Sequence, residues 1–177
     1  MLKTTSAWQI AGFIFTSIAG VLLHFLFDRS ENSVLVALFS AVNESIWEHL
    51  KLLFFPMFIF AILQSRFSGK EHKNFWCVKL TGSILGIVFI PVLYYTINGI
   101  FGSTPDWVNI AIFFIVAFTS YFTEKLMFKR NIVTCKSPKK AIFFLCLIAV
   151  IFFIFTFKPP HLPLFEDPIT KTYGYIK

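Results

Sequence analysis

The sequence predicts an all-α fold, a polytopic membrane helix bundle of about five transmembrane helices with a short interfacial or re-entrant helix before the second. The first observation is composition: of 177 residues, 56% are hydrophobic and only 14% are charged. Soluble domains are typically about 25% charged, and one of this size could not bury so much apolar surface, whereas lipid can solvate it. The second observation is that apolar runs of spanning length recur along the chain. The third is that the charge of the connecting segments alternates.

Five segments approach the roughly 20 apolar residues that an α-helix needs to cross the hydrocarbon core of a bilayer. The first is too long for the apolar region of a signal peptide and is followed by no A-x-A cleavage pattern, so it is expected to be retained. Each of the first four has a tryptophan at its first or second position, and interfacial belts favour this residue. The predicted spans are residues 7–27, 46–65, 76–100, 107–123 and 140–157.

The charges of the connecting segments predict the orientation of the chain. Segments 64–75 and 124–140, with Lys3 and Lys79, place eleven basic residues and two acids on one side, a net charge of +9. The other side has five basic residues and seven acids, a net charge of −2, which completes the +7 of the chain. Because Lys and Arg are enriched in cytoplasmic loops, the N-terminus is expected inside and the C-terminus outside. The basic character therefore indicates topology in a lipid bilayer, and no nucleic-acid partner is expected.

The segment 33–42 is apolar but too short to span a bilayer. Either it forms a separate interfacial or re-entrant helix, or the second span is very long and tilted. We favour the separate helix because Ser45 and Glu48 fit the S-x-x-E capping box that marks a helix start. Pro56 is expected to kink the helix that follows.

The chain is expected to form one transmembrane domain, residues 1–158, followed by a proline-rich extracytoplasmic tail, residues 159–177, which could fold over the outer face. Its three cysteines are Cys77, Cys135 and Cys146, and none has the CxxC spacing of a metal site. The first two lie in or beside predicted cytoplasmic segments. Three reduced thiols are therefore expected, without a disulfide.

Histidines and acids gather on the predicted outer side of the membrane. Ionisable groups near the hydrocarbon region are costly, so they usually face a bundle interior or a cavity. Imidazole and carboxylate groups together suit Zn²⁺, and a bound metal could activate water for hydrolysis. The residues expected to converge on such an ion are His24, Glu44, Glu48 and His49, with His161 or Asp167 from the tail.

The hypothetical metal site assigns a role to each of these side chains. The ligands would be His24, Glu48, His49 and His161, and the catalytic carboxylates would be Glu44, Glu48 and Asp167. Structural interpretations stay open: Glu48 would cap its helix and pair with Lys51, and Glu44 would favour the positive end of the helix dipole. His24 would then be a hydrogen-bonded contact between helices, and His161 would be a solvated loop residue. The chain contains no H-E-x-x-H motif.

The block N-E-S-I-W-E-H-L-K at residues 43–51, with Pro56 after it, resembles the signature of a family of small bacterial integral membrane proteins known only as a domain of unknown function. The tail, from Pro159-Pro160-His161 through Tyr173-Gly174, resembles the same family. The resemblance extends over nearly the whole chain. It implies a multi-pass protein of the bacterial cytoplasmic membrane in which the block and the tail are the defining features, and it implies no particular activity.

Three functions are compatible with the sequence. The first is a metal-dependent hydrolase of a lipid or envelope substrate. The second is an accessory or sensing protein that binds a membrane-protein partner or a lipid. The third is a small transporter subunit, in which a homo-oligomer would form the pore. A transport path needs polar groups toward the other face, and there only Lys79 and Glu124 carry charge, at helix ends.

Overall fold

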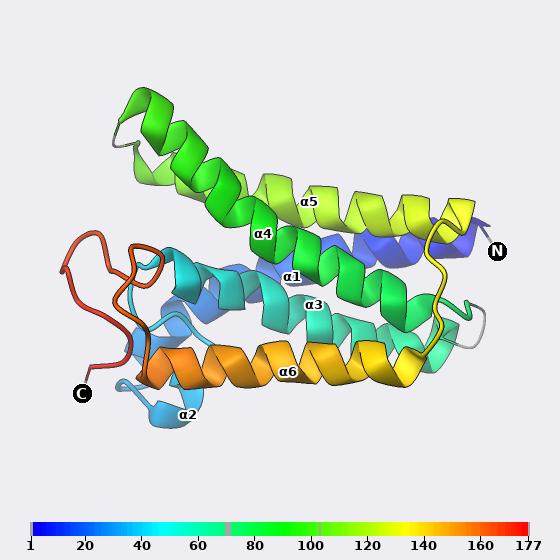
Figure 1. The fold of residues 1–177 in the computed structure, drawn as a ribbon, viewed down its shortest axis with the longest axis horizontal. Helices are drawn as coiled ribbons and strands as arrows, with labels where there is room; N and C mark the ends of the chain where they lie inside the picture. The colour runs from blue at the N-terminus through cyan, green and yellow to red at the C-terminus, as the bar shows by residue number, and fades with distance from the viewer. Residues whose placement is uncertain (1, 70–71, 103, 177) are drawn as a thin grey trace.

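The computed structural model describes residues 2–69, 72–102 and 104–176. These residues form an all-α fold with six helices, as the sequence predicts (Figure 1). Five of the helices are long and apolar enough to cross a membrane. The helices are α1 (Leu2–Arg29), α2 (Val34–Ala37), α3 (Ile46–Ser68), α4 (Phe75–Phe101), α5 (Asp106–Arg130) and α6 (Pro138–Phe157).

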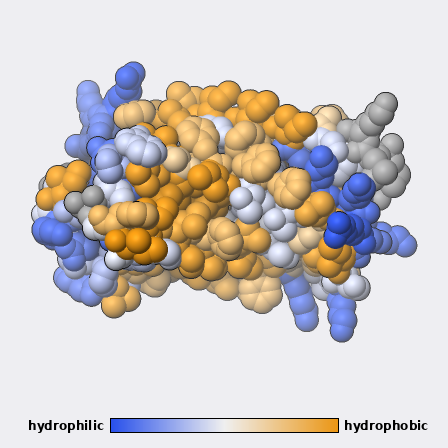
Figure 2. Space-filling model, turned by 90° about the horizontal axis from the view of Figure 1, so that it is seen from above, coloured by the Kyte–Doolittle hydropathy of each residue, from blue (hydrophilic) through white to orange (hydrophobic). Residues whose placement is uncertain are grey.

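The five long helices run side by side, with α4 crossing the others at an angle (Figure 1). The chain after α6 and the short helix α2 lie at one end of the bundle, which we call the tail end. The N-terminus and the connection between α5 and α6 lie at the other end, which we call the basic end. Hydrophobic side chains form a band between two more hydrophilic ends (Figure 2), which is the surface that a lipid bilayer covers.

Local sequence signals explain where the helices begin. The hydroxyl of Ser45 accepts a hydrogen bond from the Glu48 backbone N–H at 3.4 Å, so Ser45 caps the start of α3. The second half of the expected capping box is not formed, because the Ser45 N–H donates to Asn43 Oδ1 at 3.0 Å and the Glu48 carboxylate faces Lys51. The separate helix expected within segment 33–42 is α2, four residues long. Pro56 lies inside α3, and the helix continues through it.

Helix α3 lies at the centre of the core. Its buried apolar side chains include Leu53 and Phe54, both 0% exposed, and they pack with side chains from α4, α5 and α6. Helix α1 approaches closely at Gly20, where an added Cβ would lie 2.5 Å from the Phe113 ring and 2.9 Å from the Leu52 carbonyl oxygen. Glycine is therefore required there for α1, α3 and α5 to come together.

Two lysines that contribute to the charge difference between the two membrane faces, Lys51 and Lys79, are buried in the bundle. Lys79 lies 2.5 Å from Glu124 near the basic end, and Lys51 lies 2.6 Å from Glu48 near the tail end. All four side chains are at most 3% exposed. Each charge therefore has an opposite charge beside it, as burial requires.

The expectation of three reduced thiols is wrong, because Cys77 and Cys135 form a disulfide and only Cys146 is free. The pairing depends on tertiary structure. The first turn of α4 and the segment between α5 and α6 lie together at the basic end, although 58 residues separate the two cysteines in sequence. Spacing along the chain carries no sign of this proximity.

Candidate functional site

The tail folds over its end of the bundle and is held there by backbone hydrogen bonds. Trp47 N–H donates to the Leu164 carbonyl at 3.0 Å, and Tyr175 N–H donates to the Thr156 carbonyl at 2.7 Å. The Trp47 ring also packs against Phe165, with ring centroids 4.6 Å apart. The tail is therefore part of the packed structure around the predicted polar residues.

Glu48 points into the protein core and not toward the histidines. Its carboxylate accepts hydrogen bonds from the Val42 backbone N–H at 3.0 Å and the Thr156 hydroxyl at 3.4 Å, and it pairs with Lys51. Lys51 also donates to the Ala37 carbonyl at 2.8 Å and to the Thr156 hydroxyl at 2.9 Å. Glu48 and Lys51 thus connect α3 to α2 and α6.

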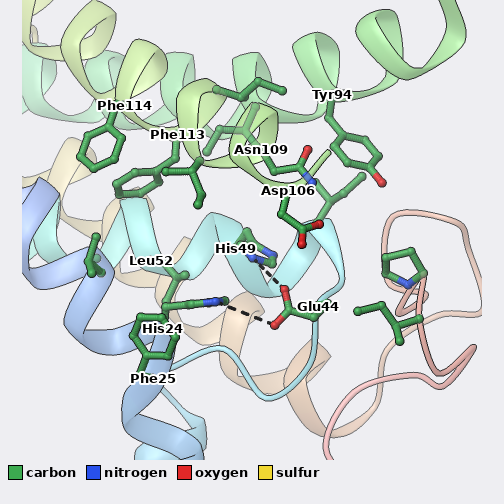
Figure 3. A pocket seen from close by; sticks show the side chains of 18 residues that line it. His24, Phe25, Glu44, His49, Leu52, Tyr94, Asp106, Asn109, Phe113 and Phe114 are labelled. Carbon is green, nitrogen blue, oxygen red and sulfur yellow. Dashed lines mark ion pairs between the residues drawn. The ribbon is translucent and has the colours of Figure 1, made fainter. Parts of the chain in front are cut away.

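Three of the predicted residues do come together at the tail end: His24 from α1, Glu44 from the segment before α3, and His49 from α3 (Figure 3). The Glu44 carboxylate lies between the two rings. One oxygen is 3.9 Å from His24 Nε2 and the other is 3.4 Å from His49 Nε2. The ring centroids of the two histidines are 5.3 Å apart. One ligand atom from each residue lies within 4.8 Å of the others, a spacing that could hold a metal ion.

The histidine rings are oriented with Nε2 toward Glu44. His49 Nδ1 lies 2.8 Å from the Ser45 carbonyl oxygen, one helical turn earlier, which favours a proton on Nδ1 and leaves Nε2 as the atom facing Glu44. His24 Nδ1 is buried and has no hydrogen-bond partner within the described part of the chain. A backbone carbonyl that holds Nδ1–H is the usual support of a metal-ligating imidazole.

A cavity of about 610 Å³ opens beside the three residues (Figure 3). Its volume is within the range of about 300–1,000 Å³ that is usual for small-molecule sites. Apolar side chains make up most of the wall, and all of the long helices except α6 contribute, together with Pro168 and Ile169 of the tail. The site is thus a mostly apolar chamber that His24, Glu44 and His49 line with polar atoms.

Three polar residues face the histidines from the other side of the cavity: Tyr94 of α4 and Asp106 and Asn109 of α5 (Figure 3). The Oδ1 atom of Asn109 is buried without a partner in the described structure. Asp106 and Asn109 are not among the site residues predicted from the sequence. Their spacing of three residues at the start of the fourth span was the available signal, since it places them on one helical face.

The tail carboxylate Asp167 is hydrogen bonded to the segment that carries Glu44. It accepts hydrogen bonds from the backbone N–H groups of Ile169 at 2.8 Å, Thr170 at 3.2 Å and Glu44 at 3.4 Å. Burial alone would raise the pKa of Asp167, but these hydrogen bonds hold it below the ordinary value of 3.8. Asp167 is therefore a positioning residue for the segment that carries Glu44.

His161 lies apart from the other two histidines. Its ring stacks on Tyr173 with centroids 4.5 Å apart, and the side chain is exposed on the tail. The structure therefore brings together His24, Glu44 and His49, and places Glu48 and His161 elsewhere.

The charge of Glu44 is favoured by its two neighbours. The contact with His49 lowers the pKa of Glu44 below 4.5, and the nearby imidazoles lower it further, while partial burial opposes the shift. At neutral pH the group therefore presents a carboxylate between two imidazoles, which is a donor set suited to Zn²⁺.

Residues 1–175 match the family described as "Family of unknown function (DUF6512)". No curated protein and no solved structure gives a significant match to the chain.

Proposed function

The chain belongs to the DUF6512 family of unknown function, and from its site we propose that it is a multi-pass membrane hydrolase that holds a divalent metal, preferably Zn²⁺, with His24, Glu44 and His49. The observation that carries the proposal is the orientation of His49. Its Nδ1 is occupied by the Ser45 carbonyl, and its Nε2 faces a carboxylate and a second imidazole.

The spacing of the three ligand atoms supports this assignment. Two ligands that each lie about 2.1 Å from a tetrahedral zinc ion are about 3.4 Å apart. The His49–Glu44 contact of 3.4 Å already has this value, the His24–Glu44 contact is 3.9 Å, and one ligand atom from each of the three residues lies within 4.8 Å of the others. Binding of the ion would therefore require the more distant of these ligand atoms to move closer together. Two histidines and one glutamate would leave a fourth position of a tetrahedral ion free for water or substrate.

The remaining residues of the cavity supply what hydrolysis also needs. A metal at this position would lower the pKa of bound water and polarise a carbonyl group. The Asp106 carboxylate points toward the His–Glu group from the opposite wall (Figure 3), so we assign the proton-accepting role to Asp106 in place of Asp167. Tyr94 and Asn109 offer hydrogen bonds that would orient a substrate between the two walls.

We further propose that the tail end, and with it the site, lies outside the cytoplasmic membrane. The charge difference supports this orientation, with +9 on the basic side and −2 on the other. The Cys77–Cys135 disulfide at the basic end favours the opposite orientation, because disulfides are rare in the reducing cytoplasm. We give the charges more weight, since they involve every connecting segment whereas the disulfide is one bond that can be reduced.

An accessory or sensing function is the second candidate, and one observation favours it. A protonated His49 would pair with Glu44 at the same 3.4 Å without any metal. The cavity would then bind a lipid or a partner segment without turnover.

Metal analysis of the protein purified in detergent separates these two functions. After equilibration with Zn²⁺ and removal of excess metal, we expect about one zinc per chain, in keeping with one tetrahedral site. His49→Ala and His24→Ala should each lose it. The matched control is His161→Ala, which removes an exposed histidine from the same end and should retain the metal. Zinc that persists in His49→Ala, or that never binds the native protein, contradicts the metal site.

A further inference from the structure

We propose that the ligand of the cavity is an acyl lipid that enters sideways from the bilayer between α1 and α5. That this lipid is a substrate rests on the proposed hydrolase function. That a lipid binds in the cavity rests only on the shape and polarity of the cavity. Lipid binding and lipid hydrolysis can therefore be tested separately.

The cavity is polar near the tail end and apolar deeper in the bundle. Asp106 lies at the start of α5, and Phe113, which also lines the cavity, is seven residues further along, or about 10 Å deeper at 1.5 Å per residue. On α1, Gly20 lies about 6 Å deeper than His24 by the same rise. A ligand that fills this space has a polar group at the level of the histidines and a hydrocarbon chain below it.

The floor of the apolar part is closed by buried side chains, of which Leu52 is 4% exposed and Ile90 is 6% exposed. Leu52 belongs to the central helix α3, and Ile90 is a buried residue of α4. Lipids that only surround the outside of the bundle cannot reach them. Contact between an acyl chain and these two side chains is therefore specific to occupancy of the cavity.

The rim of the cavity faces the bilayer. Three of its apolar lining residues are exposed in the isolated chain: Val21 is 44% exposed, Phe25 is 53% exposed and Ile110 is 57% exposed. The first two are on α1 and the third is on α5, so exposed apolar surface on both helices continues into the chamber. In Figure 3, Phe25 of α1 and Phe113 and Phe114 of α5 lie toward one side of the cavity, and Tyr94 and Asp106 lie toward the other.

The tail lies over the end of the cavity that is nearest water. Pro168 and Ile169 line it there, directly after Asp167, which is hydrogen bonded to the Glu44 backbone. The water-facing side is therefore partly covered by the tail. The rim between α1 and α5 is lined by apolar side chains, through which an acyl chain can pass without leaving a hydrophobic environment.

The hydrolysable bond is then an acyl ester or amide at the level of His24, Glu44 and His49. Water adds across this bond: the hydroxyl group joins the acyl carbon, the bond from that carbon to oxygen or nitrogen breaks, and the leaving alcohol or amine takes the proton. No oxidant or reductant takes part. The fatty acid that is released keeps its chain in the apolar part of the cavity.

The test uses the full-length protein in vesicles of phosphatidylethanolamine and phosphatidylglycerol that contain a phosphatidylglycerol with a photoreactive diazirine on its acyl chain. After irradiation, mass spectrometry of the peptides locates the cross-links. We expect cross-links at the buried residues Leu52 and Ile90 in addition to the lipid-facing surface. Cross-links restricted to lipid-facing positions would overturn the proposal.

A matched pair of variants tests the lateral route. Ile110→Trp adds bulk at the rim, whereas Ile115→Trp makes the same change at a residue of α5 that is equally exposed, 56% against 57%, and does not line the cavity. We expect the buried cross-links to fall about tenfold in Ile110→Trp, equivalent to about 1.4 kcal/mol of binding free energy. They should be unchanged in Ile115→Trp. Equal cross-linking in both variants would overturn the lateral route.

The same labelling distinguishes failure of this inference from failure of the metal site. Native protein from which a chelator has removed the zinc should keep the buried cross-links. Buried cross-links in a native protein that binds no metal would support lipid binding and overturn hydrolysis. Bound zinc without buried cross-links would overturn lipid binding and leave the metal site in place.

Discussion

Replacing Lys51 by methionine is expected to lower the free energy of unfolding by about 3–5 kcal/mol, because it leaves the Glu48 carboxylate buried without a counter-charge. The two side chains are 0% and 1% exposed, and the N–O distance is 2.6 Å. At an effective dielectric constant of about 20, that distance corresponds to an attraction of about 6 kcal/mol. The substitution removes this attraction, whereas the cost of having taken the carboxylate out of water remains.

The substitution also removes two hydrogen bonds that join neighbouring elements. Lys51 donates to the Ala37 carbonyl of α2 and to the Thr156 hydroxyl of α6. Each is worth about 1 kcal/mol net. The expected loss is therefore at the upper part of the range, and the docking of α2 should weaken with it.

Reversible unfolding in mixed micelles of mild detergent and sodium dodecyl sulfate, followed by tryptophan fluorescence, measures the effect. The exposed Lys158→Met at the same end is the control, and its stability should be close to that of the native protein. The double variant Glu48→Gln/Lys51→Met removes both charges and should be more stable than Lys51→Met alone. A Lys51→Met protein within about 1 kcal/mol of native, or a double variant with additive losses, would refute the reasoning.

Three further predictions concern the tail and the disulfide. Because the folded pKa of Asp167 is below its ordinary 3.8, its stabilisation of the tail is present above that pH and is lost as the pH falls below it. Limited proteolysis should therefore release the tail in strong acid, and Asp167→Asn should release it already at neutral pH; a tail equally protected in both would contradict this. In protein purified without reductant, alkylation should label Cys146 alone, and labelling of all three thiols would contradict the disulfide. Cys77→Ser should cost about 2–4 kcal/mol of stability, measured in the same micelles, because the Cys77–Cys135 bond closes a loop of 58 residues.

Much of the fold could be predicted because spanning helices leave strong local signals. The five apolar runs, the N-cap at Ser45 and the short segment that forms α2 are each visible within a short window of the sequence. In a bilayer every backbone polar group must be satisfied within the chain, so a long apolar run has essentially one regular structure available to it. The predicted spans and the helices differ mainly at their ends, as with α5, which continues to Arg130 beyond the predicted span 107–123.

The candidate site could be predicted only in part. His24, Glu44 and His49 were selected because costly ionisable groups at one membrane depth are expected to meet. Glu48, in the same motif, was selected on the same grounds, and the structure places it in the core with Lys51. Side chains at positions 44 and 48 share a helical face only if both are helical, and Glu44 lies before the cap of α3.

The sequence by itself determined that this chain has the composition of a membrane protein, how many times it can span the bilayer, and at which end of the bundle its histidines and acids gather. These properties follow from hydropathy, length and charge, which act locally along the chain. Only the tertiary structure decided that Glu44 lies between two imidazoles while Glu48 faces Lys51, that Cys77 meets Cys135, and that Asp106 and Asn109 face the histidines across a cavity. The physical reason is that each of these contacts depends on how helices distant in sequence pack and rotate against one another, and a local pattern of residues does not specify that rotation.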